Sequence, residues 1–368
     1  MKRLSEFDQL ADPTFSSTVI DWQRQHGRHA LPWQNTTDAY RIWLSEIMLQ
    51  QTQVAAVLGY YARFLERFPS LDALAAAPLD DVMALWSGLG YYTRARNLHA
   101  CARRVVAEYG AVFPIEPKLL ADLPGIGRST AAAISAFSSG TRAAILDGNV
   151  KRVFARVFGI EQYPGIKQVE DALWLRADAL LPETGIERYT QGLMDLGATL
   201  CTRARPDCAR CPLRQRCVAF ASGRTAELPV RKPPKTKPEK RAAMLVIVER
   251  GQVLLEQRTG SGIWGALLSL PEVDGHAALS AALPSAAASQ LAAGRFGLVE
   301  EVQALLPLVH VFTHYKLHIH PQRIVLAQRA ATLVPGYVWW DLAQIEKAPL
   351  PAPVKKLLVQ LAQPTLFT

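Results

Sequence analysis

A single segment rich in proline and lysine, RKPPKTKPEKR (231–241), separates two parts of the chain whose apolar residues follow different periods. Its three prolines and six basic residues favour an extended tether over a packed element. Before it, apolar residues recur at helical spacing; after it, short apolar runs are typical of strands. We therefore predict a mainly α domain over 1–228, a linker over 229–241 and a small α/β domain over 242–368.

The periodicity also predicts individual elements within each part. Gly, Pro and Asp punctuate helices expected near 14–26, 38–52, 53–67, 78–87, 91–109, 129–138, 147–158, 166–181 and 185–200. After the linker, strands are expected at 242–249, 252–258, 305–320 and 323–329, with helices near 284–293 and 351–361.

Four of the five cysteines lie in one stretch, CTRARPDCARCPLRQRC (201–217). The chain begins without a signal-peptide pattern, and no window approaches the ~18 uninterrupted apolar residues of a membrane span. The expected compartment is the reducing cytoplasm, where disulfides rarely persist. Metal or cluster ligation is therefore the main interpretation, with zinc and an iron–sulfur cluster both compatible with four cysteines: Cys201, Cys208, Cys211 and Cys217. The fifth, Cys101, is expected to be a buried thiol.

The net charge of +9 is concentrated before the strand-rich part. From residue 242 onward the chain carries 9 basic and 8 acidic residues, whereas the first 241 residues carry 32 basic and 24 acidic ones. This surplus indicates a polyanionic partner for the first part, with solubility alone as the alternative.

Two carboxylates in the helical part are candidates for catalysis. Glu46 lies in AYRIWLSEIMLQQTQV, a stretch apolar almost all round, so burial should raise its pKa and make it a general acid. Asp147 directly precedes a helix, where a carboxylate caps the helix and is held ionised. Cleavage of a glycosidic bond needs both a protonated general acid and an ionised carboxylate. A solvated glutamate and a purely structural cap remain the alternatives.

Two further segments suit contacts with DNA. In LPGIGRSTAAAISAF, Gly125 and Gly127 permit a tight turn that aims backbone N–H groups at a phosphate, although an ordinary turn between helices fits too. GLGYYTRARNL (88–98) interleaves aromatic and arginine residues, as in proteins that wedge into distorted DNA, with core tyrosines as the alternative.

Taken together, SEIMLQQTQV, GLGYYTRARNL, LPGIGRSTA, LDGNVKRV and the C-x6-C-x2-C-x5-C array resemble the helix–hairpin–helix DNA glycosylases that carry an iron–sulfur cluster. From about residue 15 to the C-terminus, the chain is most similar to the MutY-type adenine DNA glycosylases. The resemblance implies a [4Fe–4S] cluster on the four cysteines and no nucleotide cofactor. It implies roles for Glu46 as acid/base, Asp147 as transition-state stabiliser with Asn149 beside it, Gln51 and Tyr91 as probes of the base stack, and 123–129 as a phosphate-binding hairpin.

The implied partner is double-stranded DNA with adenine opposite 8-oxoguanine or guanine. We expect the protein to act as a monomer and not to bind a membrane. Glu46 would protonate the base at N7, and Asp147 would either stabilise the sugar cation or trap it covalently. Water would then leave an abasic site. Bifunctional relatives such as endonuclease III carry a lysine where this chain has Ser129, and serine cannot form their Schiff base. We therefore expect a monofunctional enzyme in base excision repair, with Ser129 on the DNA-binding hairpin.

The C-terminal part resembles the Nudix fold through EQRTGSGIWGALLSLPE (256–272), yet the acidic magnesium box is missing: HAALSAALPSAAASQ (276–290) contains no acidic residue. The missing box argues against a Nudix-type hydrolase. The presence of both Glu46 and Asp147 argues against a non-enzymatic iron–sulfur protein. The family's 8-oxoguanine recognition motif matches Phe312, Thr313 and His314, with an edge aromatic and a surface histidine as the alternative.

Overall fold

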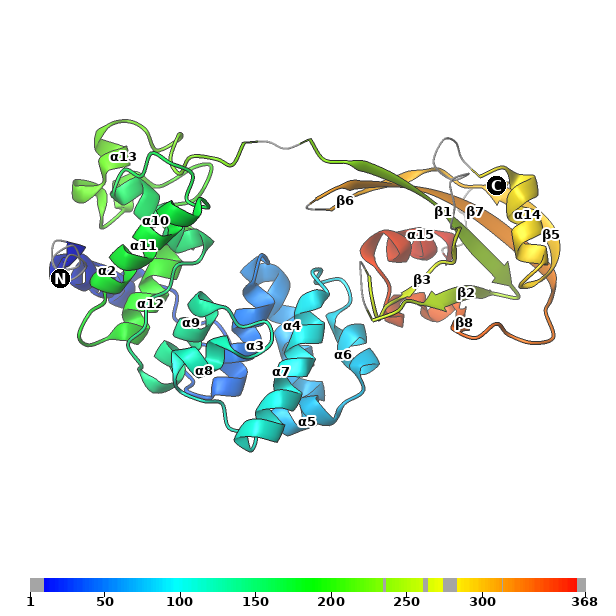
Figure 1. Cartoon of the computed structure of the whole chain (residues 1–368), viewed down its shortest axis with the longest axis horizontal. Coiled ribbons are helices and arrows are strands. Elements are labelled where there is room, and N and C mark those ends of the chain that lie inside the picture. Colours follow the sequence, from blue (N-terminus) through cyan, green and yellow to red (C-terminus); the bar gives the residue numbers. More distant parts are fainter. Residues whose placement is uncertain (1–9, 234–235, 261–263, 274–282, 313, 363–368) are drawn as a thin grey trace. The chain divides into compact units, whose positions relative to one another are not determined.

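The computed structural model describes residues 10–233, 236–260, 264–273, 283–312 and 314–362. The chain divides into two compact units, drawn in Figure 1. The first contains Met1–Ala76 and Asn97–Pro234; the second contains Ala77–Arg96 and Lys235–Thr368. The second unit thus includes a segment from within the helical part of the sequence. Among the described residues, no helix is long and apolar enough to cross a membrane.

The helical pattern is confirmed throughout the described part of the sequence before the linker. The helices are α2 (Pro13–His26), α3 (Ala39–Leu49), α4 (Val54–Arg67), α5 (Leu71–Ala76), α6 (Leu79–Trp86), α7 (Thr93–Tyr109), α8 (Pro117–Ala121), α9 (Arg128–Ser139), α10 (Gly148–Val157), α11 (Lys167–Ala179), α12 (Ile186–Asp195) and α13 (Val218–Ala221). The sequence did not predict α5, α8 and α13, because four to six residues are too few to show a helical period.

The core of the first unit packs α2 against α10 and α12. The ring of Phe15 on α2 meets the rings of Phe154, Phe158 and Tyr189 at centroid distances of 5.9, 5.7 and 6.5 Å. Such aromatic burial is among the largest apolar contributions that a side chain can make. The packing fixes α10 and α12, whose ends form the site described below.

The end of α12 is continued by a π-helical turn, Leu196–Leu200, which leads into the cysteine-rich loop. A side chain cannot fit at Gly197, because a Cβ there would lie 2.5 Å from Cβ of Asn149. The start of α10 and the end of α12 are therefore in direct contact. Two 3₁₀ turns follow in the cysteine-rich loop, Cys208–Arg210 and Arg214–Arg216.

The second unit is built on a mixed sheet. Its strands are β1 (Glu239–Glu249), β2 (Gln252–Gln257), β3 (Leu268–Ser269), β4 (Glu272–Val273), β5 (Gly297–Ala304), β6 (Leu308–Val311), β7 (Lys316–Arg329) and β8 (Tyr337–Asp341). β1 and β7 are parallel central strands, in register from Glu239 opposite Lys316 to Val248 opposite Val325. Around the sheet lie α14 (Ser285–Ala293), a 3₁₀ turn at Leu342–Lys347 and α15 (Ala352–Ala362).

The sheet differs from the sequence prediction in four respects. The strand expected at 305–320 is divided between β6 and β7 by a turn in which Phe312 N donates to Tyr315 O at 2.9 Å. β7 then continues through Pro321 to Arg329, so the second predicted strand is its continuation. β1 begins at Glu239, inside the predicted linker, because β7 supplies backbone partners there. The weakly alternating β5 and β8 were not predicted.

Candidate active site

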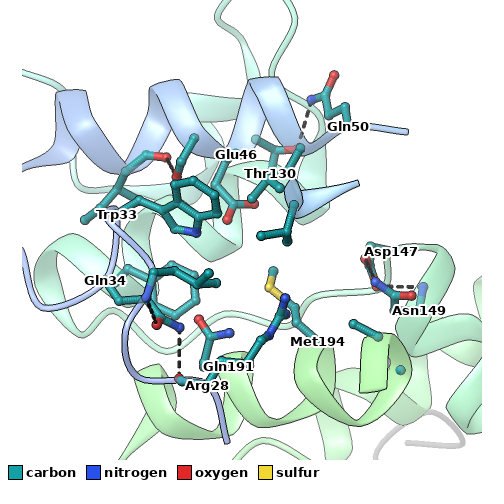
Figure 2. A pocket seen from close by; sticks show the side chains of 18 of the residues that line it. Arg28, Trp33, Gln34, Glu46, Gln50, Thr130, Asp147, Asn149, Gln191 and Met194 are labelled. Atoms are coloured by element: carbon teal, nitrogen blue, oxygen red, sulfur yellow. Dashed lines mark hydrogen bonds between the residues drawn. The ribbon is translucent and has the colours of Figure 1, made fainter. Parts of the chain in front are cut away.

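One large cavity, of about 1620 Å³, opens among the helices of the first unit. Figure 2 shows side chains from α3, from the loop before it, from the start of α10 and from α12 around this space. The volume exceeds that of a typical small-ligand pocket. The cavity brings together six of the residues predicted from sequence: Glu46, Gln51, Gly127, Ser129, Asp147 and Asn149.

Glu46 reaches this cavity from α3, where Ile42, Ser45 and Ile47 are almost fully buried. Within the described part of the chain, its carboxyl makes no hydrogen bond that would stabilise the ionised form. Burial, followed by the negative charge of Asp147, raises the pKa of Glu46 from 4.5 to about 8. The carboxyl is therefore protonated at neutral pH, as a general acid requires.

Asp147 is the N-cap of α10, as the sequence predicted. Its Oδ1 accepts hydrogen bonds from the backbone N–H groups of Asn149 at 3.0 Å and Val150 at 2.8 Å. Burial nevertheless raises the pKa of Asp147, and the two backbone hydrogen bonds and the Arg152 charge offset only part of that rise. The hydrogen bonds at the helix terminus favour the ionised form, as the sequence predicted, but desolvation is the larger effect on the pKa of Asp147.

Asn149 connects Asp147 to the end of α12. Its Nδ2 donates to Oδ2 of Asp147 at 3.3 Å, and its Oδ1 accepts from Nη2 of Arg152 at 2.8 Å. The Arg152 guanidinium also donates to the carbonyl of Gly197 at 2.7 Å and to that of Cys201 at 2.7 Å. The carboxylate is thus held by a chain of charged and polar contacts that ends in the cysteine-rich loop.

The hairpin before α9 leaves the start of that helix accessible. Gly125 adopts φ +78°, and a Cβ there would lie 2.9 Å from Cβ of Asn97. Gly127 is the N-cap of α9 with φ −93°, and a Cβ would meet no protein atom within 4 Å. Nothing inside the protein therefore excludes a side chain at Gly127, and open space lies before the helix N-terminus. Nε2 of Gln50 contacts Oγ1 of Thr130 at 3.4 Å (Figure 2).

Gln51 and Tyr91 both have left-handed backbone, with φ +57° and +50°. Such angles are uncommon outside glycine and are often retained at functional sites. Gln51 is exposed and lines the cavity. Tyr91 belongs to the second unit, where 47% of it is exposed and the Arg94 guanidinium lies 5.5 Å from its ring centroid. Neither residue is part of the buried core.

All four clustered cysteines line one small cavity of about 20 Å³ beside α10. Within the described residues, no three His, Cys, Asp or Glu side chains converge as ligands of a single ion. The almost fully buried Arg156 donates from Nη1 to Sγ of Cys201 at 3.3 Å and to the carbonyl of Thr202 at 2.7 Å. A charged donor at this position would stabilise a Cys201 thiolate. A [4Fe–4S] cluster would use one cysteine sulfur for each iron, so its four cysteines would not need to meet at a single ion.

Several of the arginines between the cysteines contact other side chains of the protein. Arg216 pairs with Asp12 at 2.6 Å, and Arg210 lies 3.6 Å from Asp207. The Arg214 guanidinium lies 4.8 Å from the ring centroid of Phe220. Arg203, by contrast, lines the large cavity. The sequence reading missed Arg152 and Arg156, because their one-turn spacing on α10 resembles that of an ordinary basic helix face.

The proposed recognition motif lies in an aromatic cluster of the second unit. Phe312 packs against His310 at a centroid distance of 4.5 Å, Tyr315 at 4.6 Å and Trp264 at 5.6 Å. His314 is exposed and lies 6.2 Å from Phe312. Thr313 lies outside the described residues. Trp264 and His310 were not singled out from the sequence, because Trp264 is far from Phe312 in the chain and only the fold brings the rings together.

Comparison with known proteins assigns a class to this fold and site. Residues 44–178 match the model of the HhH-GPD superfamily base excision DNA repair proteins, and residues 242–360 match that of the NUDIX domain. The structure of a thermostable thymine-DNA glycosylase aligns with TM-score 0.52 and 29% identity, covering 60% of this chain and 99% of that one. The helical fold with its carboxylate-lined cavity is that of a base-excision DNA glycosylase.

Relatives define the family further. Adenine DNA glycosylase of Buchnera aphidicola subsp. Schizaphis graminum is 35% identical, over 94% of this chain and 97% of its own. The Homo sapiens adenine DNA glycosylase is 32% identical, over 95% of this chain and 74% of its own. The chain belongs to the adenine DNA glycosylase family. The family resemblance and the fold class predicted from sequence are thereby confirmed.

Proposed function

We propose that this adenine DNA glycosylase removes adenine paired with 8-oxoguanine or guanine and leaves an abasic site. The observation that carries the catalytic assignment is the shared cavity of Glu46 and Asp147, two carboxyls with different surroundings. Glu46 has a pKa raised to about 8 and no hydrogen bond within the described chain, whereas Asp147 accepts bonds from two backbone N–H groups and Asn149. Glu46 is therefore suited to donate a proton, and Asp147 is suited to carry the negative charge that stabilises a sugar cation.

In the proposed reaction, the target adenine is turned out of the helix into the cavity. Glu46 donates its proton to N7 of the base, and protonation makes the base a better leaving group. As the glycosidic bond breaks, Asp147 stabilises the positive charge on the sugar. Water then adds to the sugar carbon and gives a proton to the Glu46 carboxylate, which restores the acid form.

Ser129 makes a monofunctional reaction the expected one. Its Oγ lies on the cavity wall and accepts a hydrogen bond from Leu146 N at 3.0 Å. A hydroxyl cannot form a Schiff base with the sugar, so strand cleavage by that route is not expected. The glycine hairpin would bind phosphate, and Gln51 and Tyr91 would contact the base stack.

The four cysteines would hold a [4Fe–4S] cluster. When bound, the cluster supplies iron–thiolate bonds that close the cysteine-rich loop. Arg156 would donate to one of its ligands, Cys201, and Arg152 joins the carbonyl of the same residue to Asn149. The loop would in this way support the position of Asp147.

Base release in single turnovers tests the proposal. Duplexes with adenine opposite 8-oxoguanine, guanine or thymine are compared for the unmodified protein, Glu46→Gln and Glu66→Gln. Glu66 is an exposed glutamate on the neighbouring helix α4 and serves as the matched control. We expect release from the first two duplexes only, abolished by Glu46→Gln and unaffected by Glu66→Gln. Near-normal rates for Glu46→Gln would show that another group is the acid.

A further inference from the structure

A fully buried carboxylate joins two chain segments that form one wall of the large cavity. Asp195, at the end of α12, has an exposed fraction of 0%. Its Oδ1 accepts hydrogen bonds from Nε of Arg28 at 2.6 Å and from Nε2 of Gln191 at 2.8 Å. Its Oδ2 accepts from the backbone N–H of Arg28 at 2.8 Å. Both carboxylate oxygens are therefore used, and Arg28 is held by its main chain as well as its side chain.

Arg28 begins a loop, residues 28–37, that is closed by its own side chains. Gln34 donates from Nε2 to the carbonyl of Arg28 at 3.1 Å, and its Oε1 accepts from Leu31 N at 3.1 Å. Asn35 donates from Nδ2 to the carbonyl of His29 at 2.9 Å. The loop is thus held together by its own hydrogen bonds. Arg28 attaches it to α12 through Asp195.

This loop faces the proposed acid. Figure 2 shows Arg28, Gln34 and Gln191 across the cavity from Glu46, and all four line the cavity. A base that receives a proton from Glu46 must be held from the opposite side, where the loop and α12 lie. The position of that wall depends on Asp195, which itself does not line the cavity.

The same short segment also supports the sugar side of the site. Two residues after Asp195, the carbonyl of Gly197 accepts from Arg152, whose guanidinium holds Asn149 beside Asp147. Residues 195–197 mark the change from α-helix to π-helix, a distortion frequent at functional sites. One junction therefore positions both the wall opposite Glu46 and the carboxylate that faces the sugar.

We propose that Asp195 is a positioning residue for base excision, because its buried carboxylate fixes the 28–37 loop against α12 and so sets the distance between the extruded base and Glu46. The inference rests on the proposed function. Asp195→Asn keeps the shape of the side chain but turns one acceptor into a donor that faces the donors of Arg28. The loop should then move away from α12 without loss of the groups that touch DNA phosphates.

The expected effect is on the chemical step rather than on binding. A displacement of about 1 Å can lower the rate about 10²-fold, so we expect a loss of that order in the single-turnover rate of Asp195→Asn. Affinity for the duplex should change less than about threefold. The midpoint of the pH dependence should stay the same, because the residues of α3 around Glu46 and the charge of Asp147 are retained. A lower plateau with the same midpoint distinguishes a positioning role from loss of the acid.

Two further variants keep the test decisive. Gln34→Ala loosens the same loop without leaving a buried charge unpaired, and should slow excision about tenfold. If both residues act through the loop, the double variant should be no slower than Asp195→Asn within about threefold. Asp12→Asn is the matched control: Asp12 pairs with Arg216 at the same 2.6 Å but lies outside the cavity lining.

Thermal unfolding of each variant sets an assay temperature at which all are folded. Normal excision by folded Asp195→Asn, or an equal loss in Asp12→Asn, would overturn the inference. If Asp195→Asn does not fold, the test rests on Gln34→Ala. An excision rate of Gln34→Ala within threefold of that of the unmodified protein would then overturn the inference. Failure of the unmodified protein to release adenine would instead refute the proposed function.

Discussion

Oγ of Ser129 accepts a hydrogen bond from the backbone N–H of Leu146 at 3.0 Å. Ser129 lies in the first turn of α9, after the glycine hairpin, and Leu146 directly precedes Asp147. The hairpin expected to bind DNA and the carboxylate expected to stabilise the sugar are therefore joined by one contact. Because Leu146 is buried, its N–H has no access to water as a replacement partner.

The first prediction concerns strand cleavage. The unmodified protein should give no borohydride-trapped adduct with DNA, and strands should break only after alkali is added. Ser129→Lys places an amine in the cavity and should produce a trapped adduct, at the expense of the contact with Leu146. Ser129→Ala is the control: it loses the same contact, about 1 kcal/mol of stability, but gains no nucleophile. Efficient trapping by the unmodified protein or by Ser129→Ala would identify another amine.

The second prediction is a pH dependence of base release. Burial raises the pKa of Glu46 to about 8, so its acid form dominates below that pH. The single-turnover rate should be nearly constant between pH 6.5 and about 7.5, and should fall about tenfold per unit well above pH 8. Measurement at constant ionic strength is needed because DNA binding depends on salt. A rate that is unchanged at pH 9 would exclude Glu46 as the proton donor.

The third prediction follows from the same pKa and concerns stability. A carboxyl whose pKa is 4.5 when unfolded and about 8 when folded binds more protons in the folded state between those values. Stability therefore falls as pH rises through this window, by at most about 1.4 kcal/mol per unit. Glu46→Gln removes this dependence, so its free energy of unfolding relative to the unmodified protein should increase from pH 5 to pH 8. A constant difference would mean that Glu46 titrates normally.

The elements and the candidate carboxylates could be predicted from sequence because each has a local signal. Glu46 lies in an apolar helix, Asp147 precedes one, and the cysteines are close in sequence. The Asp195–Arg28 pair has no such signal, since its partners are 167 residues apart and each resembles a surface residue. The direction of the Asp147 pKa also depended on burial that only packing reveals. Local patterns thus predict the chemistry, whereas the groups that position it require the fold.

The fourth prediction concerns iron. Purified protein should be brown and contain about four irons per chain, as a cluster held by four thiolates requires. Cys211→Ser should lower the iron content, because Cys211 lines the small cavity with the other three cysteines. Cys101→Ala is the matched control, since Cys101 is buried in α7 away from that loop. Active protein with one zinc and no iron would contradict the cluster assignment.

The last prediction separates chemistry from lesion recognition. The first part of the chain contains both carboxylates, the hairpin and the cysteines, whereas the strand-rich part contains the aromatic cluster around Phe312. A chain cut within 231–241 should still remove adenine opposite guanine but lose much of its preference for adenine opposite 8-oxoguanine. Lost base contacts typically cost ~1–3 kcal/mol of discrimination each, which makes a loss of one to two orders of magnitude the expected result.

Substitutions in the full chain test the same division without removing a domain. His314→Ala should reduce the preference in the same direction but less, because one exposed side chain is lost while the cluster around Phe312 remains. His318→Ala is the matched control: His318 lies on β7 and its Nε2 contacts Glu239 at 3.1 Å rather than the aromatic cluster. Single-turnover rates on the two duplexes are compared at one salt concentration, since affinity for DNA depends on salt. If the truncated chain and His314→Ala both keep the full preference, the lesion is read by the helical part, and the recognition role assigned to Phe312 and His314 is wrong.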